Sequence, residues 1–238
     1  MQVTHLFHSG FLVELPHTLL LFDYWQGVLP RLAQDKPLFV FVSHRHHDHY
    51  SREIWQLLHR HPDVRYVVDS GVPLPPSRPE NLLIVQPRQR YTWQGVHIET
   101  IRSTDEGCAF LVEAEGTSVY HAGDLNWWHW EGEPDADNAW HDKAFHEELD
   151  HIRGRRFDVA CLPLDPRQEG NAWWGFVDFL RACPCDRVFP MHYGADRSAM
   201  LAYLQLPELA PWLSRIHTED HWSEEETAAP CQKGESEP

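Results

Sequence analysis

A dense run of metal-ligand side chains follows directly on a short, continuous apolar segment of this chain. The segment Leu38-Phe39-Val40-Phe41-Val42 is typical of a strand buried on both faces, and Ser43 ends it. The run His44-Arg45-His46-His47-Asp48-His49 comes next, and Ser51 is placed to cap a helix that extends to about His61. A solvated histidine-rich loop would not be expected between a buried strand and a capped helix. We therefore interpret the run as a metal site carried on a rigid frame.

The chemistry of the run restricts the metal. His44 and His46 are two residues apart, so an extended chain directs both imidazoles to one side, while Asp48 and His49 follow a turn and approach from another direction. Imidazole nitrogen and carboxylate oxygen suit Zn, Mn, Fe, Co or Ni, and no thiolate is present to favour a soft metal. Four such ligands crowd a single tetrahedral ion. The pattern predicts two ions, about 3.5–4 Å apart.

The rest of the chain predicts an αββα fold, in which two mixed β-sheets pack face to face with helices on the outer faces. Short apolar or alternating segments predict strands over residues 3–7, 11–15, 18–22, 38–42, 64–68, 82–85, 96–101, 109–113, 118–121, 157–162 and 187–190. Helical spacing predicts helices over 51–61, 138–153, 173–181 and 199–206. We expect one domain over residues 1–217 and an acidic, disordered tail over 218–238.

Charge and composition exclude several classes of function. The net charge of −16 repels phosphate backbones, which argues against nucleic-acid binding, although bound cations could still attract a small anionic substrate. Five scattered cysteines predict reduced thiols, mostly buried. The chain contains no run of about 18 apolar residues, so we expect no membrane span. The N-terminus has no secretory pattern, so we expect a cytoplasmic protein.

Further motifs accompany the first in a familiar order. His-x-His-x-Asp-His after an apolar strand resembles the signature of the metallo-β-lactamase superfamily, and this motif is the most specific of the set. Tyr120-His121-Ala122-Gly123-Asp124 resembles the later motif in which a strand ends in Gly-Asp, and Pro190-Met191-His192 resembles the strand-end histidine motif. His8-Ser9-Gly10-Phe11 is similar to the opening turn of the branch that includes ascorbate-phosphate lactonase and related uncharacterised hydrolases. The resemblance covers roughly residues 1–217.

The resemblance implies two divalent cations (Zn, Mn or Fe) and a ligand set for each. It assigns His44 and His46 to the first metal, Asp48, His49 and His192 to the second, and Asp124 to a bridging position.

One ligand of the superfamily pattern is missing. The superfamily supplies a third histidine to the first metal at the place where this chain reads Ile101-Arg102-Ser103-Thr104-Asp105-Glu106-Gly107. Either Asp105, or less favourably Glu106 or Thr104, takes that role, or the first metal is weak or absent. An oxygen donor there would favour Mn or Fe over Zn. His97 is expected to be structural, and His121 is either a ligand or a neighbour of the site.

The implied activity is hydrolysis of an ester, lactone or phosphoester bond in a small substrate, an anionic one included, by a metal-bound hydroxide. Asp48 and Asp124 could orient the water or move its proton, and His8 could donate a proton to the leaving group or bind substrate. Asp23, which ends a strand, is either an outer partner of a ligating histidine or a turn residue.

Two segments outside the motifs are candidate substrate contacts. Trp127, Trp128 and Trp130 follow Asp124 on one loop and either form an aromatic wall over the substrate or anchor their loop to the core. Arg167 follows a buried strand and either clamps a carboxylate or phosphate or forms a surface ion pair.

Two other functions compete with a small-molecule hydrolase. The first is a metal-dependent nuclease or RNA-processing enzyme, against which the acidic charge argues. The second is a non-catalytic metal-binding protein, suggested by the missing histidine. The sequence leaves the substrate, the native metal and the oligomeric state open.

Overall fold

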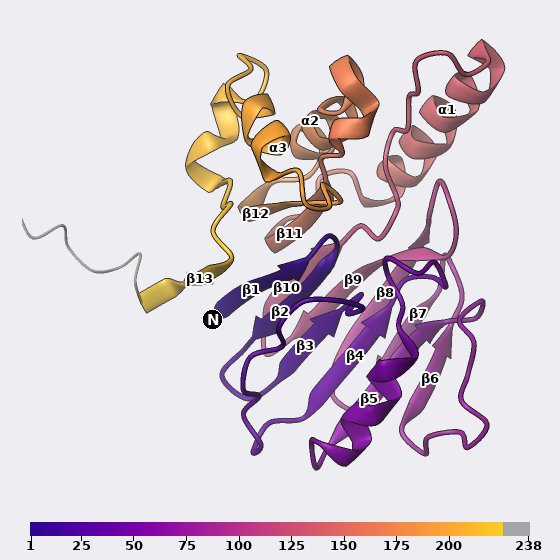
Figure 1. Cartoon of the computed structure of the whole chain (residues 1–238), viewed down its shortest axis with the longest axis vertical. Coiled ribbons are helices and arrows are strands. Elements are labelled where there is room, and N and C mark those ends of the chain that lie inside the picture. The colour runs from indigo at the N-terminus through magenta and orange to yellow at the C-terminus, as the bar shows by residue number, and fades with distance from the viewer. Residues whose placement is uncertain (226–238) are drawn as a thin grey trace, which may run out of the picture.

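The computed structural model describes residues 1–225 and contains two β-sheets packed face to face (Figure 1). The seven-stranded sheet has the order β13-β1-β2-β3-β4-β5-β6. Its strands are β1 (Gln2–Phe7), β2 (Gly10–Glu14), β3 (Leu19–Phe22), β4 (Leu38–Val42), β5 (Val64–Asp69), β6 (Leu82–Val85) and β13 (His221–Ser223).

The second sheet has six strands in the order β12-β11-β10-β9-β8-β7. They are β7 (Arg90–Trp93), β8 (Val96–Arg102), β9 (Cys108–Ala114), β10 (Thr117–His121), β11 (Phe157–Pro163) and β12 (Cys185–Met191). The α-helices are α1 (Asp135–Ile152), α2 (Trp174–Ala182) and α3 (Arg197–Tyr203), and the 3-10 helices are η1 (Arg52–His59), η2 (Pro166–Asn171) and η3 (Ala210–Arg215).

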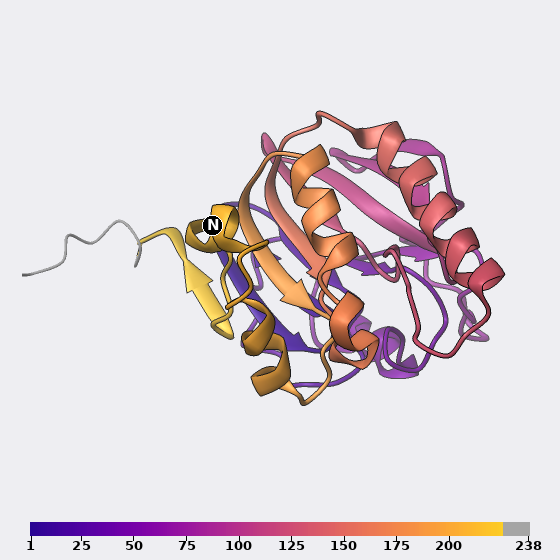
Figure 2. The same cartoon turned by 90° about the horizontal axis from the view of Figure 1, so that it is seen from above.

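Helices cover the outer faces of both sheets, which confirms the predicted αββα sandwich. On the six-stranded sheet, Tyr120 of β10 stacks on Phe179 of α2 with ring centroids 4.5 Å apart. On the seven-stranded sheet, Tyr66 of β5 packs on Trp55 of η1 at 4.6 Å. Figure 2 shows α1 and α2, in rose and orange, side by side over the six-stranded sheet.

Aromatic side chains fill the space between the sheets. Phe22 of β3 and Phe41 of β4 stack at 4.7 Å, and Phe41 meets Phe110 of β9 at 5.3 Å. All three side chains are fully buried. Burial of each such side chain stabilises the fold by about 1.5–3 kcal/mol, so the two sheets are held in a fixed relation up to the edge where the site lies.

Strand direction brings distant parts of the chain to that edge. β1, β3 and β4 run in one direction in the first sheet, because β2 is antiparallel to both β1 and β3 while β3 and β4 are parallel. In the second sheet β10, β11 and β12 are parallel. The two sets of carboxyl ends meet, since the N–H of His192 after β12 donates to the carbonyl of His8 after β1 at 3.1 Å.

The expected meanders and turns are present. β1 to β3 and β7 to β10 are antiparallel, and Glu115-Gly116 forms the hairpin turn between β9 and β10 with φ of 55° and 76°. The helix expected from residue 51 is the 3-10 helix η1, with Ser51 accepting from the N–H of Glu53 at 3.2 Å. Strand β7 was not predicted, because its alternation of polar and aromatic residues spans only four residues.

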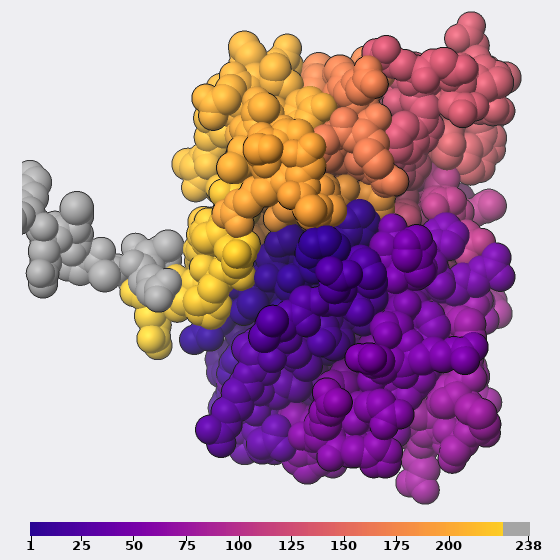
Figure 3. All heavy atoms as spheres, in the orientation of Figure 1, coloured from indigo at the N-terminus to yellow at the C-terminus, as the bar shows by residue number. Residues whose placement is uncertain are grey.

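The expected disordered tail is wrong in its first part. Residues 221–223 form β13 and pair with the start of β1, with Trp222 opposite Val3. Trp222 is 3% exposed and its ring lies 6.3 Å from that of Phe189 in β12. The acidic residues around it masked this anchor in the sequence. Figure 3 shows the indigo N-terminal and yellow C-terminal residues in contact. Residues 226–238, including Cys231, lie outside the described part of the chain.

Two further expectations concern thiols and membranes. Cys108, Cys161, Cys183 and Cys185 are free and buried, as predicted. None of the helices within residues 1–225 has the length and apolar character needed to cross a membrane.

Removing the Trp222 side chain tests the role of β13. We expect Trp222→Ala to lower the free energy of unfolding by about 3–5 kcal/mol, which corresponds to a fall in melting temperature of roughly 10 °C. The matched control is Trp140→Ala on α1, since Trp140 is 50% exposed. Equal melting temperatures for the two variants would contradict the assignment of β13 as a structural anchor.

Candidate metal centre

Asp23 organises the loop that carries the histidine run. Its carboxylate accepts hydrogen bonds from the backbone N–H of Ser43 at 2.8 Å, from the Ser43 hydroxyl at 2.6 Å and from His49 Nδ1 at 2.8 Å. Burial alone would raise the pKa of Asp23, but the hydrogen bond and positive charge of His49 hold it below its usual value. The carboxylate is fully buried, so it fixes both ends of the loop and the ring orientation of His49.

Asp165 fixes the ring orientation of His192, the histidine that follows β12. Its Oδ2 lies 3.0 Å from His192 Nδ1, and both of its oxygens accept from Arg167. Burial would raise the pKa of Asp165, yet the hydrogen bonds from His192 and Arg167 lower it to about 2. His192 therefore presents its other nitrogen, Nε2, away from Asp165.

The Nε2 atoms of three histidines converge on Asp124. His49 Nε2 and His192 Nε2 lie 3.0 and 3.2 Å from Asp124 Oδ1, and His44 Nε2 lies 3.3 Å from Oδ2. His49 Nε2, His192 Nε2 and Asp124 Oδ1 are buried and form no hydrogen bond within residues 1–225. Imidazoles that donate through Nδ1 turn a lone pair toward this carboxylate, so an arrangement of this kind fits a bound cation.

The charges of these side chains favour positive charge beside the Asp124 carboxylate. Burial would lower the pKa of His49, but Asp124 and Asp23 raise it well above its usual value. Burial would likewise raise the pKa of Asp124, which the neighbouring histidines hold well below its usual value. The cluster therefore favours added positive charge, which a metal cation would supply.

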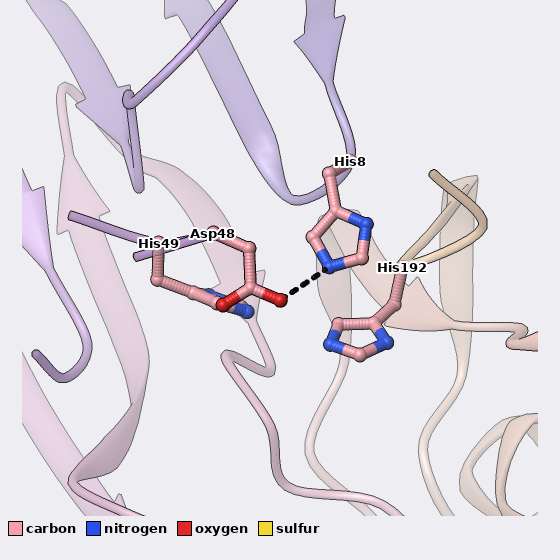
Figure 4. Close-up of side chains that lie close together, drawn as sticks. All are labelled: His8, Asp48, His49 and His192. Atoms are coloured by element: carbon pink, nitrogen blue, oxygen red, sulfur yellow. Dashed lines mark ion pairs between the residues drawn. The ribbon is translucent and has the colours of Figure 1, made fainter. Parts of the chain in front are cut away.

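The ligand atoms form two groups within residues 1–225. In each group, the atoms lie within 4.8 Å of one another. One group is His44, His46 and Asp124; the other is His8, Asp48, His49 and His192. Figure 4 shows the second group, in which His192, after β12, faces His8, Asp48 and His49 from the opposite sheet. The grouping brings together the residues that the sequence assigned to each metal and adds His8, whose Nε2 lies 3.5 Å from Asp48 Oδ2.

Strained backbone marks three of these positions. His8, Asp23 and His192 have φ of 55°, 42° and 67°, in the left-handed region. Such a conformation costs a non-glycine residue about 1–2 kcal/mol. Here it aims the side chains into the site, and the surrounding contacts hold it: the N–H of Gly194 donates to His8 Nδ1 at 3.2 Å.

The position of the missing histidine holds no equivalent ligand. The Thr104 hydroxyl donates to the carbonyl of Asn126 at 2.7 Å and so is turned away from the first group. Asp105 Oδ2 lies 3.5 Å from His46 Nδ1, but this exposed carboxylate belongs to neither group. Glu106 forms a bidentate pair with Arg45. Asp105 remains the nearest oxygen donor to His46, so its role as a ligand remains a hypothesis.

Two other histidines are excluded as ligands by their contacts. His121 Nε2 donates to the Ser9 carbonyl at 2.8 Å, and its Nδ1 accepts from the N–H of Gly123 at 3.2 Å. His121 is therefore a packed neighbour of the site. His97 is exposed on β8, with Nδ1 3.0 Å from Thr92 Oγ1, in agreement with a structural role.

A cavity of about 460 Å³ opens over the two groups. Its lining residues are His46, His47, Asp48, Asp105, Asp124, Trp128, Trp130, His141, Arg167 and His192. Trp128 lines the cavity and also anchors its loop, since its indole N–H donates to the Asp124 carbonyl at 3.0 Å. The expectation that Trp127 lines the cavity is wrong, because its ring packs on Trp174 of α2 at 5.0 Å. Trp130 lies there instead, parallel to Trp128.

Arg167 forms an ion pair, one of the two roles considered for it, and keeps part of its guanidinium exposed for the other, which is binding a carboxylate or phosphate. Its Nε and Nη2 donate to Asp165, and its side chain is still 63% exposed at the wall of the cavity. Its Nη1 donates no hydrogen bond within residues 1–225. Part of the guanidinium is thus held in place, and part is free to meet a ligand.

Several site residues escaped the sequence analysis. Ser43, Asp165 and His141 were not singled out, although Asp165 begins the Asp-Pro-Arg segment after a buried strand. That segment was a usable signal for a strand-end carboxylate. His141 lies on helix α1 and carries no local signal.

Comparison with known proteins agrees with this geometry. Residues 2–133 match the family model described as β-lactamase superfamily domain. The chain is 30% identical over 222 residues to a UPF0173 metal-dependent hydrolase of Opitutus terrae, covering 84% of this chain and 83% of that protein. A second protein of that name, from Desulforamulus reducens, is 27% identical and covers 81% and 84%. The structure of Igni18, a metallo hydrolase from Ignicoccus hospitalis, shares the fold, with a TM-score of 0.56, 17% identity and coverage of 93% and 98%.

Neutralising Asp165 tests how His192 is held. We expect Asp165→Asn to weaken metal binding about 10–100-fold, because the amide lacks the charge that orients and polarises the imidazole. Competition with a chromophoric chelator measures the dissociation constant. Asp186→Asn, at the opposite end of β12, is the matched control. Similar metal affinity in both variants would argue against this role for Asp165.

Gly107 tests the packing beneath the histidine loop. A Cβ atom there would lie 2.0 Å from the Ser43 carbonyl oxygen and 2.7 Å from His44 Cβ, so Gly107→Ala must displace the loop. Gly116 has a similar φ, 76° against 70°, and a Cβ there meets nothing within 4 Å. We expect both alanine variants to lose stability, and only Gly107→Ala to lose metal binding as well. Retention of metal by Gly107→Ala would show that the loop is not held in this way.

Proposed function

Because this chain belongs to the metallo-β-lactamase superfamily and is one of its metal-dependent hydrolases, we propose that it cleaves an ester, lactone or phosphoester bond of a small anionic substrate. The observation that carries the proposal is the convergence at Asp124, on the floor of an open cavity, of buried nitrogen and oxygen atoms that form no hydrogen bond within residues 1–225. Fold alone would not support it, since one fold hosts many chemistries.

The proposed centre holds two divalent cations, Zn, Mn or Fe. His44 and His46 would hold the first, Asp48, His49 and His192 the second, and Asp124 would bridge them. When bound, such ions lower the pKa of water and polarise the bond to be cleaved. Two cations would bring four positive charges to the carboxylates of Asp23, Asp48, Asp124 and Asp165, and the Arg167 guanidinium adds one more at the cavity wall. The metals and Arg167 would thus offset the acidic chain locally and allow an anionic substrate.

The remaining chemistry is assigned to side chains of the cavity. Asp48 is half-buried, and the neighbouring His8, 3.5 Å away, lowers the pKa of its carboxyl group, so the carboxylate stays ionised and would orient the water or move its proton. His8 lies beside Asp48 and would hold that carboxylate in place; alternatively, as a fourth member of its group, it would bind the second cation. Trp128 and Trp130 would exclude water from one wall.

A substrate panel tests this proposal. We expect the metal-loaded protein to hydrolyse at least one of a p-nitrophenyl ester, an aryl lactone and bis-p-nitrophenyl phosphate. Chelation should abolish the activity, and Mn, Fe or Zn should restore it. His46→Ala and Asp124→Ala should each lower kcat/KM at least 100-fold, because each removes an interaction with the reacting centre.

His97→Ala is the control, since His97 is exposed on β8 and is not among the residues that line the cavity. Full activity in His46→Ala or Asp124→Ala would contradict the proposed centre. Activity confined to long RNA and falling steeply with salt would instead assign a nuclease.

A further inference from the structure

His141 is a cavity residue that the proposed reaction does not use. It lies on α1, which covers the outer face of the six-stranded sheet, and it reaches the same cavity as His46, Asp124 and His192. Its Nδ1 atom is buried and forms no hydrogen bond within residues 1–225. An unpaired polar atom on a residue that lines a cavity indicates a ligand or a water that satisfies it.

The geometry points to a ligand other than the metal. The ligand atoms of each metal group lie within 4.8 Å of one another, and His141 belongs to neither group. It therefore faces the groups across space that a substrate can occupy. A volume of about 460 Å³ is within the range of small-molecule sites.

Arg167 lies on the same cavity and has a free hydrogen-bonding edge. Asp165 takes up its Nε and Nη2 atoms, and its guanidinium carbon lies 5.9 Å from the centre of the Trp130 ring. These contacts hold the guanidinium plane and leave Nη1 without a partner within residues 1–225. A guanidinium held in this way loses little side-chain freedom when it binds an oxyanion.

We propose that His141 and the Nη1 edge of Arg167 bind a second anionic oxygen group of the substrate, remote from the bond that is cleaved. This inference rests on the proposed function and narrows it: the substrate is a small ester, lactone or phosphoester that also carries a non-reacting carboxylate or phosphate. Asp105 is the one lining carboxylate outside both metal groups; its Oδ2 lies 3.5 Å from His46 Nδ1, and its charge also acts on His141.

Dicarboxylic acids are suitable probes, because one end can meet the metals and the other can meet His141 and Arg167. We would measure calorimetric binding of succinate, glutarate and adipate to the Mn-loaded protein. Each is compared with the monocarboxylic acid of the same carbon number. The wild type should bind at least one diacid about tenfold more tightly than its monoacid partner, because a hydrogen bond to a charged group adds about that factor.

Variants at position 141 separate this role from a structural one. His141→Ala should reduce the diacid preference to less than threefold. His141→Asn should retain most of it, because the Asn amide atoms are bonded to Cγ, as Nδ1 is, whereas His141→Gln should retain less. His151→Ala, at an exposed histidine of the same helix, is the matched control and should behave as wild type.

The outcomes separate a failure of the second anionic site from a failure of the proposed function. A tenfold diacid preference that survives His141→Ala would overturn the role of His141 and leave the hydrolase intact. Equal binding of diacids and monoacids by the wild type would overturn the second anionic group. Binding of neither acid by the wild type would contradict the anionic substrate of the proposed function, and the inference with it.

Discussion

The buried Asp23 carboxylate is the interaction on which the centre depends. It holds Ser43 and His49 at the two ends of the histidine loop, with contacts of 2.6 to 2.8 Å. Removing one partner of a buried pair leaves a charge that burial penalises, so this arrangement tolerates few changes. Asp165 repeats the device on the other sheet by holding His192 at 3.0 Å. The two carboxylates turn the rings so that their Nε2 atoms meet at Asp124.

The topology explains why two sheets are needed to build one centre. Each sheet contributes residues from the carboxyl ends of its parallel strands: His8, Asp23 and the histidine loop come from one, and Asp124 and His192 from the other. The packed aromatic core between the sheets fixes the distance between these two sets. The positive φ values at His8, Asp23 and His192 are local costs that this frame sustains.

The sequence predicted the features that lie in contiguous segments and missed those that tertiary packing assembles from distant segments. The apolar strand and the run 44–49 are contiguous, so the sequence alone indicated a metal site there. The strand-end motifs at Asp124 and His192 were identified by their resemblance to the superfamily. Helix α1 carries His141 to the cavity through tertiary packing, which no short pattern records. Composition misled at 221–223, because acidic neighbours concealed the apolar anchor Trp222. Trp127 and Trp128 are adjacent in the sequence, and only the packing of Trp127 against α2 turns it away from the cavity that Trp128 lines.

Metal content per chain tests the account most directly. The measurement is mass spectrometry of protein purified without added metal or chelator, repeated after reconstitution with Mn, Fe or Zn. The account predicts close to two equivalents, one for each group of ligand atoms. One equivalent after reconstitution would contradict the first site, where His44, His46 and Asp124 lack a third histidine. No bound metal in either preparation would contradict the centre as a whole.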